Sequence, residues 1–371
     1  MKGDIIMSKE KYSPMKVVDV QTIGEGPEWH EYRRKGVGGS DVSALVGCSP
    51  WTTKRALYYS KMGLDKSSPN PYTLDFGHAM EPFVAAWFQR CFDSKYKGWL
   101  EKHLGKQIKS FNIYLDPWMY KHPIHQFMQA NLDYRWECVT TDGELIEGVF
   151  ECKTTTYHTA LEKWGDDKVP PYYELQCRHY MAIMNLDYSI IACAWGNNEA
   201  DYAVGFVERD YNIENDIIAL EKDFWENNVL KHVAPPLSEE RGELEYAALQ
   251  DFKIEEQVRQ GKLPEIAITD DDMLISIEDY LSLMESKKQL EEEVKALSNK
   301  LQTAKVKALT YLAQKNTDKL ILKDTGYIIK NTDSSRTTID SKLLKEKYPN
   351  IYEEVKKVST SKRFSISPPK D

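Results

Sequence analysis

Two segments of alternating apolar and polar residues, joined by an Asp-Gly turn at 142–143, constrain the fold of this chain more than any other feature. Residues 132–136 and 148–156 both predict β-strands, because side chains in a strand point alternately to opposite faces. Glu151 and Lys153 stand two positions apart and therefore share one face of the second strand. The pattern predicts a hairpin that aims an acid and a base in the same direction.

The length of the connecting loop decides which side chain of the first strand lies opposite Glu151. A two-residue Asp-Gly loop would place Asp133 opposite Cys152, with its carboxylate on the wrong face. A three-residue loop from Thr141, with the glycine in the left-handed conformation, instead sets Asp133 opposite Glu151. Their Cβ atoms would then be about 5 Å apart.

Two carboxylates at this separation need a partner, because their mutual repulsion in a protected site would raise one pKa strongly. A divalent cation removes that conflict. Carboxylate oxygens suit Mg²⁺ or Mn²⁺, which polarises a phosphoryl oxygen and lowers the pKa of a bound water. Lys153 could orient that water or neutralise charge on the phosphate. The competing interpretation is the solvated charged face of an ordinary strand.

A third carboxylate lies on a predicted helix over residues 75–88. Glu81 shares a helix face with Val84, Ala85 and Phe88, and this is an unusual place for an acid, since Glu is rarely buried unless it is paired. One interpretation is that the dipole at the helix N-terminus favours the acid. The other is that Glu81 reaches the metal.

A second predicted helix, residues 172–184, places Gln176 and Tyr180 four positions apart on one face, where helical side chains are neighbours. There they could touch a substrate or Lys153. An interior hydrogen bond explains Gln176 equally well. The pattern adds Gln176 as a candidate catalytic residue and Tyr180 as a candidate substrate-binding residue.

An anion site is predicted where Arg33 and two further cations precede Gly38-Gly39 and a helix start at Ser40. Glycines permit a close approach of the backbone, and a helix N-terminus beside an arginine suits a phosphate group. The alternative for Ser40 is a plain helix N-cap.

Composition divides the chain near residue 236. Residues 1–235 mix short helices with strand patterns and predict one α/β domain, whereas a Pro-Pro break leads into a segment rich in Glu, Lys, Leu and Gln. Residues 236–371 predict a helical arm with a small C-terminal β element, which could serve assembly or the docking of a partner.

A long helix is predicted within that arm, from a capping-box-like start at Ser276 to Gln314. Leucines recur in it every seven positions and form one apolar seam. The seam fits either a helix that packs on its own domain or an intermolecular coiled coil. Beyond the helix we expect a hairpin around 324–326 and a closing strand over 360–369.

Bulk properties exclude several classes of protein. The six dispersed cysteines never form CxxC and predict buried free thiols instead of disulfides or a metal cluster. A formal net charge of -9 argues against a broad nucleic-acid-coating surface but allows a local basic channel. We find neither an apolar signal core nor the roughly 18 to 20 apolar residues of a membrane helix. We therefore expect a cytoplasmic protein.

Together these stretches resemble the YqaJ viral recombinase family, phage-type relatives of lambda exonuclease among the PD-(D/E)xK nucleases. The resemblance covers roughly residues 25–230 through WxxxRxxGxGGSD, GxxxEP, LD, ExK and the downstream Gln and Tyr, with Leu132 where the name of the larger family has proline. The expected fold is α/β: a restriction-endonuclease-like core with a central mixed sheet flanked by helices, plus a long C-terminal helix and a small β extension.

Carried over by position, the resemblance implies a role for each candidate residue. The roles are metal ligation, catalysis, support of the site and binding of a terminal 5′-phosphate. Asp133 and Glu151 would ligate the metal, with Glu81 at or beside it, and Lys153 would act in catalysis. Gln176 would support the site, and Arg33 with Ser40 would bind the terminal 5′-phosphate.

The implied activity is a Mg²⁺-dependent 5′-to-3′ exonuclease on duplex DNA ends. Such enzymes act in phage recombination, in the host cytoplasm, beside a single-strand-annealing protein and often as ring-shaped trimers. Related nucleases with a cysteine-ligated cluster have a cysteine spacing that this sequence lacks. Two alternatives stay open: an endonuclease of restriction or repair type, and a scaffold that binds DNA or a partner without catalysis. The clustered carboxylates argue against the scaffold, which has no physical need for them.

Overall fold

A five-stranded mixed sheet is the centre of the first of two units, residues 1–261 and 262–371, into which the computed structural model divides. Strands β7 and β8 pair in parallel, and the other neighbours pair antiparallel. In sheet order the strands are β3 (Ile108–Tyr114), β6 (Tyr134–Thr140), β7 (Leu145–Thr154), β8 (Tyr188–Ala194) and β9 (Tyr202–Glu208). The structure describes residues 12–24, 26–64, 71–165, 168–251, 270–321, 328–330 and 341–355.

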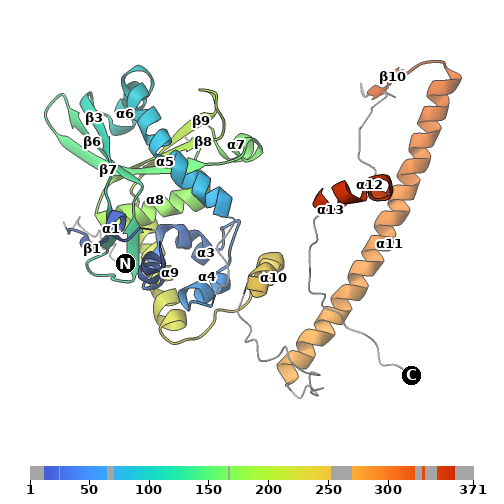
Figure 1. Cartoon of the computed structure of the whole chain (residues 1–371), viewed down its shortest axis with the longest axis horizontal. Helices are drawn as coiled ribbons and strands as arrows, with labels where there is room; N and C mark the ends of the chain where they lie inside the picture. The colour runs from blue at the N-terminus through green and yellow to red at the C-terminus, as the bar shows by residue number, and fades with distance from the viewer. Residues whose placement is uncertain are drawn as a thin grey trace, which may run out of the picture. The chain divides into compact units, whose positions relative to one another are not determined.

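Two long helices cover opposite faces of this sheet (Figure 1). Helix α5 (Pro71–Cys91) packs on the face that carries Phe150 and Cys152 of β7. Helix α8 (Pro171–Met184) packs on the face that carries Val149. Both faces of β7 are therefore buried, and the predicted α/β architecture of a central mixed sheet flanked by helices is confirmed.

A second sheet of four short strands borders the first. Its outer strand β2 runs parallel to β5, while the remaining pairs are antiparallel. In sheet order the strands are β1 (Met15–Asp19), β4 (Trp118–Lys121), β5 (Met128–Asn131) and β2 (Val37–Gly38). The shorter helices of this unit are α1 (Val20–Ile23), α2 (Pro27–Arg34), α3 (Val42–Val46), α4 (Lys54–Lys61), α6 (Lys97–Leu104), α7 (Tyr157–Lys163), α9 (Tyr211–Asp223) and α10 (Gly242–Asp251).

The segment after residue 235 still packs on the first unit. Helix α10 contacts α4, and Arg241 donates a hydrogen bond to the carbonyl oxygen of Ser49. The border between the two units therefore comes later, between Gly261 and Lys262. The division of labour predicted at residue 235 stays a prediction.

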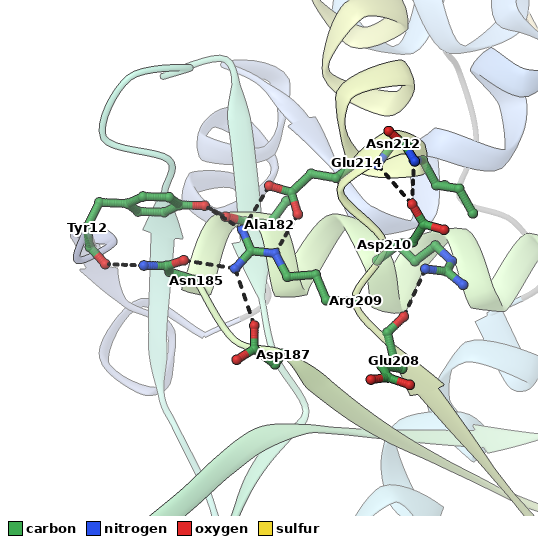
Figure 2. A network of polar contacts seen from close by, with 11 residues as sticks. Tyr12, Ala182, Asn185, Asp187, Glu208, Arg209, Asp210, Asn212 and Glu214 are labelled. Carbon is green, nitrogen blue, oxygen red and sulfur yellow. Dashed lines mark hydrogen bonds and ion pairs between the residues drawn. The ribbon is translucent and has the colours of Figure 1, made fainter. Parts of the chain in front are cut away.

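Arg209 joins three separate parts of the first unit (Figure 2). Its guanidinium makes two hydrogen bonds to Glu214 on α9, at 2.6 and 2.8 Å. It also donates to the side chain of Asn185, just after α8, at 2.8 Å and to the Tyr12 hydroxyl at 3.2 Å. This bidentate arginine therefore holds the described N-terminal segment against the end of α8.

A proton is shared inside the core between His179 and Glu221, both fully buried. His179 Nε2 lies 2.8 Å from the carbonyl oxygen of Gln129, and Nδ1 lies 2.7 Å from Glu221 Oε1. Because the carbonyl can only accept, Nε2 carries a hydrogen, and the Nδ1 contact needs a second proton. Burial opposes the charge on His179, but the Glu221 carboxylate outweighs it and raises the histidine pKa. Burial also raises the pKa of Glu221.

We expect the free energy of unfolding to fall as the pH rises above about 6.5, the pKa of an unfolded histidine. Both folded pKa values are raised, so the shared proton stabilises the fold fully below that pH, and this contribution is lost as the pH rises through the folded pKa. The slope can reach about 1.4 kcal/mol per pH unit. Glu221→Gln, whose amide needs no extra proton, should flatten the slope in urea unfolding. An equal slope in the variant would contradict the shared proton.

In its described residues, the second unit contains one long helix and four short elements. Helix α11 (Asp271–Gln314) ends where predicted but begins earlier than Ser276, because Asp270 caps it by accepting from the Met273 N–H at 2.9 Å. The two strands of the expected hairpin are present, but its turn and the expected closing strand at 360–369 lie outside the described residues. The short elements are β10 (Lys319–Ile321), β11 (Ile328–Lys330), α12 (Ser341–Lys347) and α13 (Pro349–Val355).

The apolar seam of α11 is exposed to solvent. The central Leu290, Val294 and Leu297 are each more than 60% exposed. Among the described residues of this unit, Leu312 near the end of α11 is the buried member of the helix. Neither of the two predicted partners for the seam, the chain's own domain or another chain, is tested by these exposures.

The described cysteines match the expected free thiols. All six are unpaired, and four are buried, namely Cys138, Cys152, Cys177 and Cys193. Among the described helices, none is long and apolar enough to cross a membrane.

Candidate active site

The hairpin has the three-residue loop, whose register sets the two carboxylates opposite each other. Val139 pairs with Leu145, and the Thr140 N–H donates to the Glu144 carbonyl at 2.9 Å, which leaves residues 141–143 as the loop. Gly143 has a φ of 89°, in the left-handed region that favours glycine. The two-residue alternative is therefore excluded.

This register places Asp133 across from Glu151, just before β6 begins. The last paired residues are Tyr134 and Phe150, so the next pair outward is Asp133 with Glu151. Asp133 Oδ2 accepts a hydrogen bond from the Cys152 N–H at 2.8 Å. The backbone of β7 thus fixes the orientation of this carboxylate.

Glu151 is only 1% exposed and has one saturated and one unsatisfied oxygen. Its Oε1 accepts from Lys153 Nζ at 2.5 Å and from Gln176 Nε2 at 2.6 Å. Its Oε2 is buried and, among the described residues, has no hydrogen-bond partner. A buried acceptor without a partner costs about 1–3 kcal/mol, more when it is charged. Such an atom is suited to a ligand that the protein alone does not supply.

The surroundings of Glu151 and Lys153 on β7 raise the pKa of both groups. Burial and the neighbouring Asp133 carboxylate raise the pKa of Glu151 to about 8, against the lowering effect of Lys153. Burial would lower the pKa of Lys153, but the carboxylates of Glu151 and Asp133 outweigh it and raise that pKa well above its usual value. The two carboxylates therefore keep Lys153 as an ammonium, and a further positive charge would stabilise Glu151 as the anion.

Helix α8, which packs on the sheet, supplies Gln176 and Tyr180, the pair that the sequence predicts on one helix face. Gln176 Nε2 donates to both Glu151 and the Tyr180 hydroxyl, the latter at 3.1 Å. Burial raises the pKa of Tyr180, so this phenol stays neutral. The expected contact of this pair with Lys153 is indirect, because Glu151 stands between Gln176 and the ammonium. Gln176 therefore makes an interior hydrogen bond with Tyr180 and also contacts the Glu151 carboxylate, so both interpretations of Gln176 hold.

The Gly-Gly turn packs against the same helix. A Cβ at Gly39 would lie 2.6 Å from Tyr180 Cε1 and 2.9 Å from Gln176 Cγ, closer than side chains allow. Only glycine therefore lets this turn approach α8. The predicted anion site at Gly38-Gly39 and Ser40 therefore lies against Tyr180 and Gln176. Gln176 also contacts Glu151 of the hairpin.

Arg33 and Ser40 are brought together as expected. Arg33 Nη2 donates to Ser40 Oγ at 3.0 Å, and its guanidinium lies 4.8 Å from the ring centroid of Trp29. Ser40 lies within a 3-10 turn, while α3 begins at Val42 with Asp41 before it. The hydroxyl of Ser40 therefore partners Arg33 and does not cap the helix.

Asp41 and Lys61 are residues of this region that sequence reasoning missed. Lys61 Nζ lies 2.6 Å from Asp41 Oδ2 and donates to the Arg33 carbonyl at 3.1 Å. Asp41 Oδ2 also accepts from the Gly38 N–H at 2.9 Å. Burial opposes ionisation of Asp41, but Lys61 and Arg33 outweigh it and lower the carboxyl pKa. The buried ion pair fixes the turn that presents Arg33 and Ser40.

Glu81 approaches from the other side of the sheet. It shares the α5 face of Val84, Ala85 and Phe88, as predicted, since all three are buried. With Cys152 and Lys153 it lines a cavity of about 170 Å³ at the end of β7. Among the described residues, no three His, Cys, Asp or Glu side chains converge as a complete metal centre. The structure therefore pairs Asp133 with Glu151 across the hairpin and places Glu81 at the cavity that Cys152 and Lys153 also line.

Comparison with known proteins is consistent with this geometry. Residues 28–187 match the model of the YqaJ-like viral recombinase domain. The chain is 28% identical over 342 residues to the uncharacterized protein YqaJ of Bacillus subtilis (strain 168), covering 91% of this chain and 93% of that protein.

Two solved exonucleases also resemble the chain. The alkaline exonuclease of Laribacter hongkongensis is 17% identical, covers 61% of this chain and 97% of its own, and has a TM-score of 0.38. A phage related exonuclease from Haemophilus somnus 129PT is 8% identical, covers 55% of this chain and 99% of its own, and has a TM-score of 0.33.

The mixed sheet with helices on both faces and an acid-bearing hairpin defines an α/β protein with the architecture that the sequence predicts. More specifically, residues 28–187 match the YqaJ-like viral recombinase domain. Every candidate site residue lies within this range. The family domain and the site chemistry together support a nuclease.

Proposed function

We propose that this chain is a metal-dependent DNA exonuclease that digests duplex ends from 5′ to 3′. The observation that carries the proposal is the buried Glu151 carboxylate, which has one oxygen bound by Lys153 and Gln176 and the other without a partner. It lies across the hairpin from Asp133 and inside a recombinase family domain.

A divalent cation fits these residues. Asp133 and Glu151 would hold it, with Glu81 beside them, and their all-oxygen character suits Mg²⁺ or Mn²⁺. When bound, such an ion polarises the phosphoryl oxygen and lowers the pKa of water. Lys153 would neutralise charge that develops on the phosphate.

The supporting residues would keep that arrangement in place. Gln176 holds Glu151 Oε1 toward Lys153 and is itself oriented by the Tyr180 hydroxyl. Tyr180 also backs the Gly39 turn. A shift of this helix would therefore disturb both the carboxylates and the phosphate stretch.

Digestion of three DNA substrates tests the proposal. We expect the full chain with Mg²⁺ to digest a linear 5′-phosphorylated duplex and to leave a covalently closed circle intact. EDTA should stop the reaction. A 5′ label should be released as mononucleotide before a 3′ label. Cleavage of the closed circle would instead favour the endonuclease, and no cleavage under any divalent ion would leave only the binding scaffold.

Arg33 should act on the phosphate at the DNA end. We expect Arg33→Ala to slow digestion of 5′-phosphorylated ends by about tenfold or more, since a charge-assisted hydrogen bond contributes roughly 1.5–3 kcal/mol. Digestion of 5′-hydroxyl ends should change much less. Arg34→Ala, one position along the same helix, is the matched control. Equal slowing on both kinds of end would reduce Arg33 to a general DNA contact.

We extend the proposal to the rest of the chain. The enzyme acts in phage-type recombination in the bacterial cytoplasm, with a single-strand-annealing protein as partner and a homo-oligomer, a trimer by family resemblance, as its assembly. Residues 236–371 govern assembly or partner docking and leave the chemistry to residues 1–235.

The exposed leucine seam gives this arm a direct test. An apolar stripe on a helix stabilises a protein only when something covers it. We expect Leu290→Glu with Leu297→Glu to reduce the particle mass in light scattering while digestion of short duplexes persists. Glu292→Lys, on the polar face of the same helix, should leave the mass unchanged. Equal masses for all three proteins would contradict a role of the seam in self-assembly.

A further inference from the structure

Trp51 is a large aromatic side chain that the fold leaves exposed. It is 61% exposed, although burial of an aromatic side chain is among the largest favourable terms in folding. Its indole is nevertheless held in place. The ring lies edge-on to Tyr172 with centroids 5.1 Å apart, and its centroid lies 5.9 Å from that of Tyr173.

The loop that carries Trp51 is fixed by hydrogen bonds. The buried Ser49 hydroxyl accepts from the N–H groups of Trp51 and Thr52, each at 3.3 Å. Arg241 donates to the carbonyl oxygen of the same serine. Thr53 then caps helix α4. An exposed ring on a braced loop loses little conformational entropy when a ligand covers it.

Tyr173 connects this aromatic surface to the hairpin site. Lys153 Nζ lies 5.1 Å from the centroid of the Tyr173 ring. Tyr173 also neighbours the buried Trp164, with ring centroids 5.9 Å apart. Tyr172 and Tyr173 also open the helix that carries Gln176. The exposed indole is therefore separated from Lys153 by one tyrosine ring.

We propose that Trp51, backed by Tyr172 and Tyr173, is a stacking subsite for a nucleobase of the DNA strand that is cut. The inference rests on the proposed function and names the part of the substrate that this surface takes. A nucleotide offers a flat π face and an anionic phosphate, and the surface offers an exposed indole, with the Lys153 ammonium next to the Tyr173 ring that backs it. Base stacking on an aromatic side chain tolerates any sequence, because every base has a π face.

Equilibrium binding without cleavage tests the subsite. The full chain in EDTA is titrated with a fluorescent 5′-phosphorylated hairpin duplex, and with three versions that each carry an abasic site at one of the first three nucleotides of the 5′ strand. One abasic position should weaken wild-type binding about 5- to 150-fold, the range given by roughly 1–3 kcal/mol per stacked base.

The variants make this a double-mutant cycle. Trp51→Ala should weaken binding of intact DNA by the same factor as that abasic position does in wild type. The variant should bind the DNA with that abasic position as tightly as it binds intact DNA. Trp51→Phe should retain most of the affinity. Phe83→Ala removes an exposed ring that stacks on Trp87 instead and is the matched control, expected to bind like wild type. Thermal melting verifies that each variant is folded.

The outcomes separate this inference from the proposed function. If wild type binds and digests duplex ends but Trp51→Ala binds equally well, or loses as much again at every abasic position, the subsite is overturned and the nuclease stands. If wild type neither binds nor digests duplex DNA, the proposed function fails and the subsite fails with it.

Discussion

Asp133→Asn should abolish digestion of duplex ends while the protein stays folded. The substitution removes one of the two charges that would hold the cation but keeps an oxygen that can accept from the Cys152 N–H, now 2.8 Å from Asp133. Metal stabilisation of a transition state is worth several kcal/mol, so the rate should fall by at least about 10³-fold. Initial rates on a labelled linear duplex in Mg²⁺ measure the loss.

The control separates the site from general effects of charge. Asp216→Asn changes an exposed aspartate on α9 and should digest DNA at the wild-type rate. Thermal melting of Asp133→Asn should stay close to that of wild type, because its hydrogen bond to β7 is retained. A wild-type rate in Asp133→Asn, in protein free of contaminating nuclease, would refute the assignment of the metal site.

The hairpin could be predicted from sequence because its rules are local. An Asp-Gly pair fits a loop of two or three residues, so the sequence left open whether Asp133 lies across from Glu151, and the structure selects the three-residue loop. Side-chain alternation, by contrast, places Glu151 and Lys153 on one face whatever surrounds the strand. The same is true of Gln176 and Tyr180, whose spacing of four residues fixes one helix face.

Contacts between distant segments were beyond the reach of such rules. Nothing in the spacing of Asp41 and Lys61 indicates that helix α4 buries its lysine against the Gly-Gly turn. The place of Glu81 shows the same limit, because its helix face was predicted correctly while the side of the sheet that α5 covers depends on tertiary packing. Likewise, the sequence does not indicate that Trp51 contacts Tyr172 and Tyr173, which lie far along the chain.

Lys61→Met should destabilise the protein by about 3–5 kcal/mol, the usual loss when one partner of a buried ion pair is removed. Lys61 is 9% exposed and its ammonium lies 2.6 Å from Asp41. Methionine fills a similar volume, so the loss reports the uncompensated carboxylate of Asp41 and the lost hydrogen bond to the Arg33 carbonyl. Urea unfolding at neutral pH measures the change in the free energy of unfolding.

A surface pair of the same kind is the matched control. Lys54 lies on the same helix α4, and its ion pair with Asp223, at 3.4 Å, is 32% and 56% exposed for the two side chains. Lys54→Met should therefore cost less than about 1 kcal/mol. Adding Asp41→Asn to Lys61→Met removes the unpaired charge and should recover part of the loss. If Lys61→Met costs no more than Lys54→Met, then the Asp41–Lys61 pair does not fix the turn, and the position of Arg33 and Ser40 must depend on the packing of Gly39 against α8 alone.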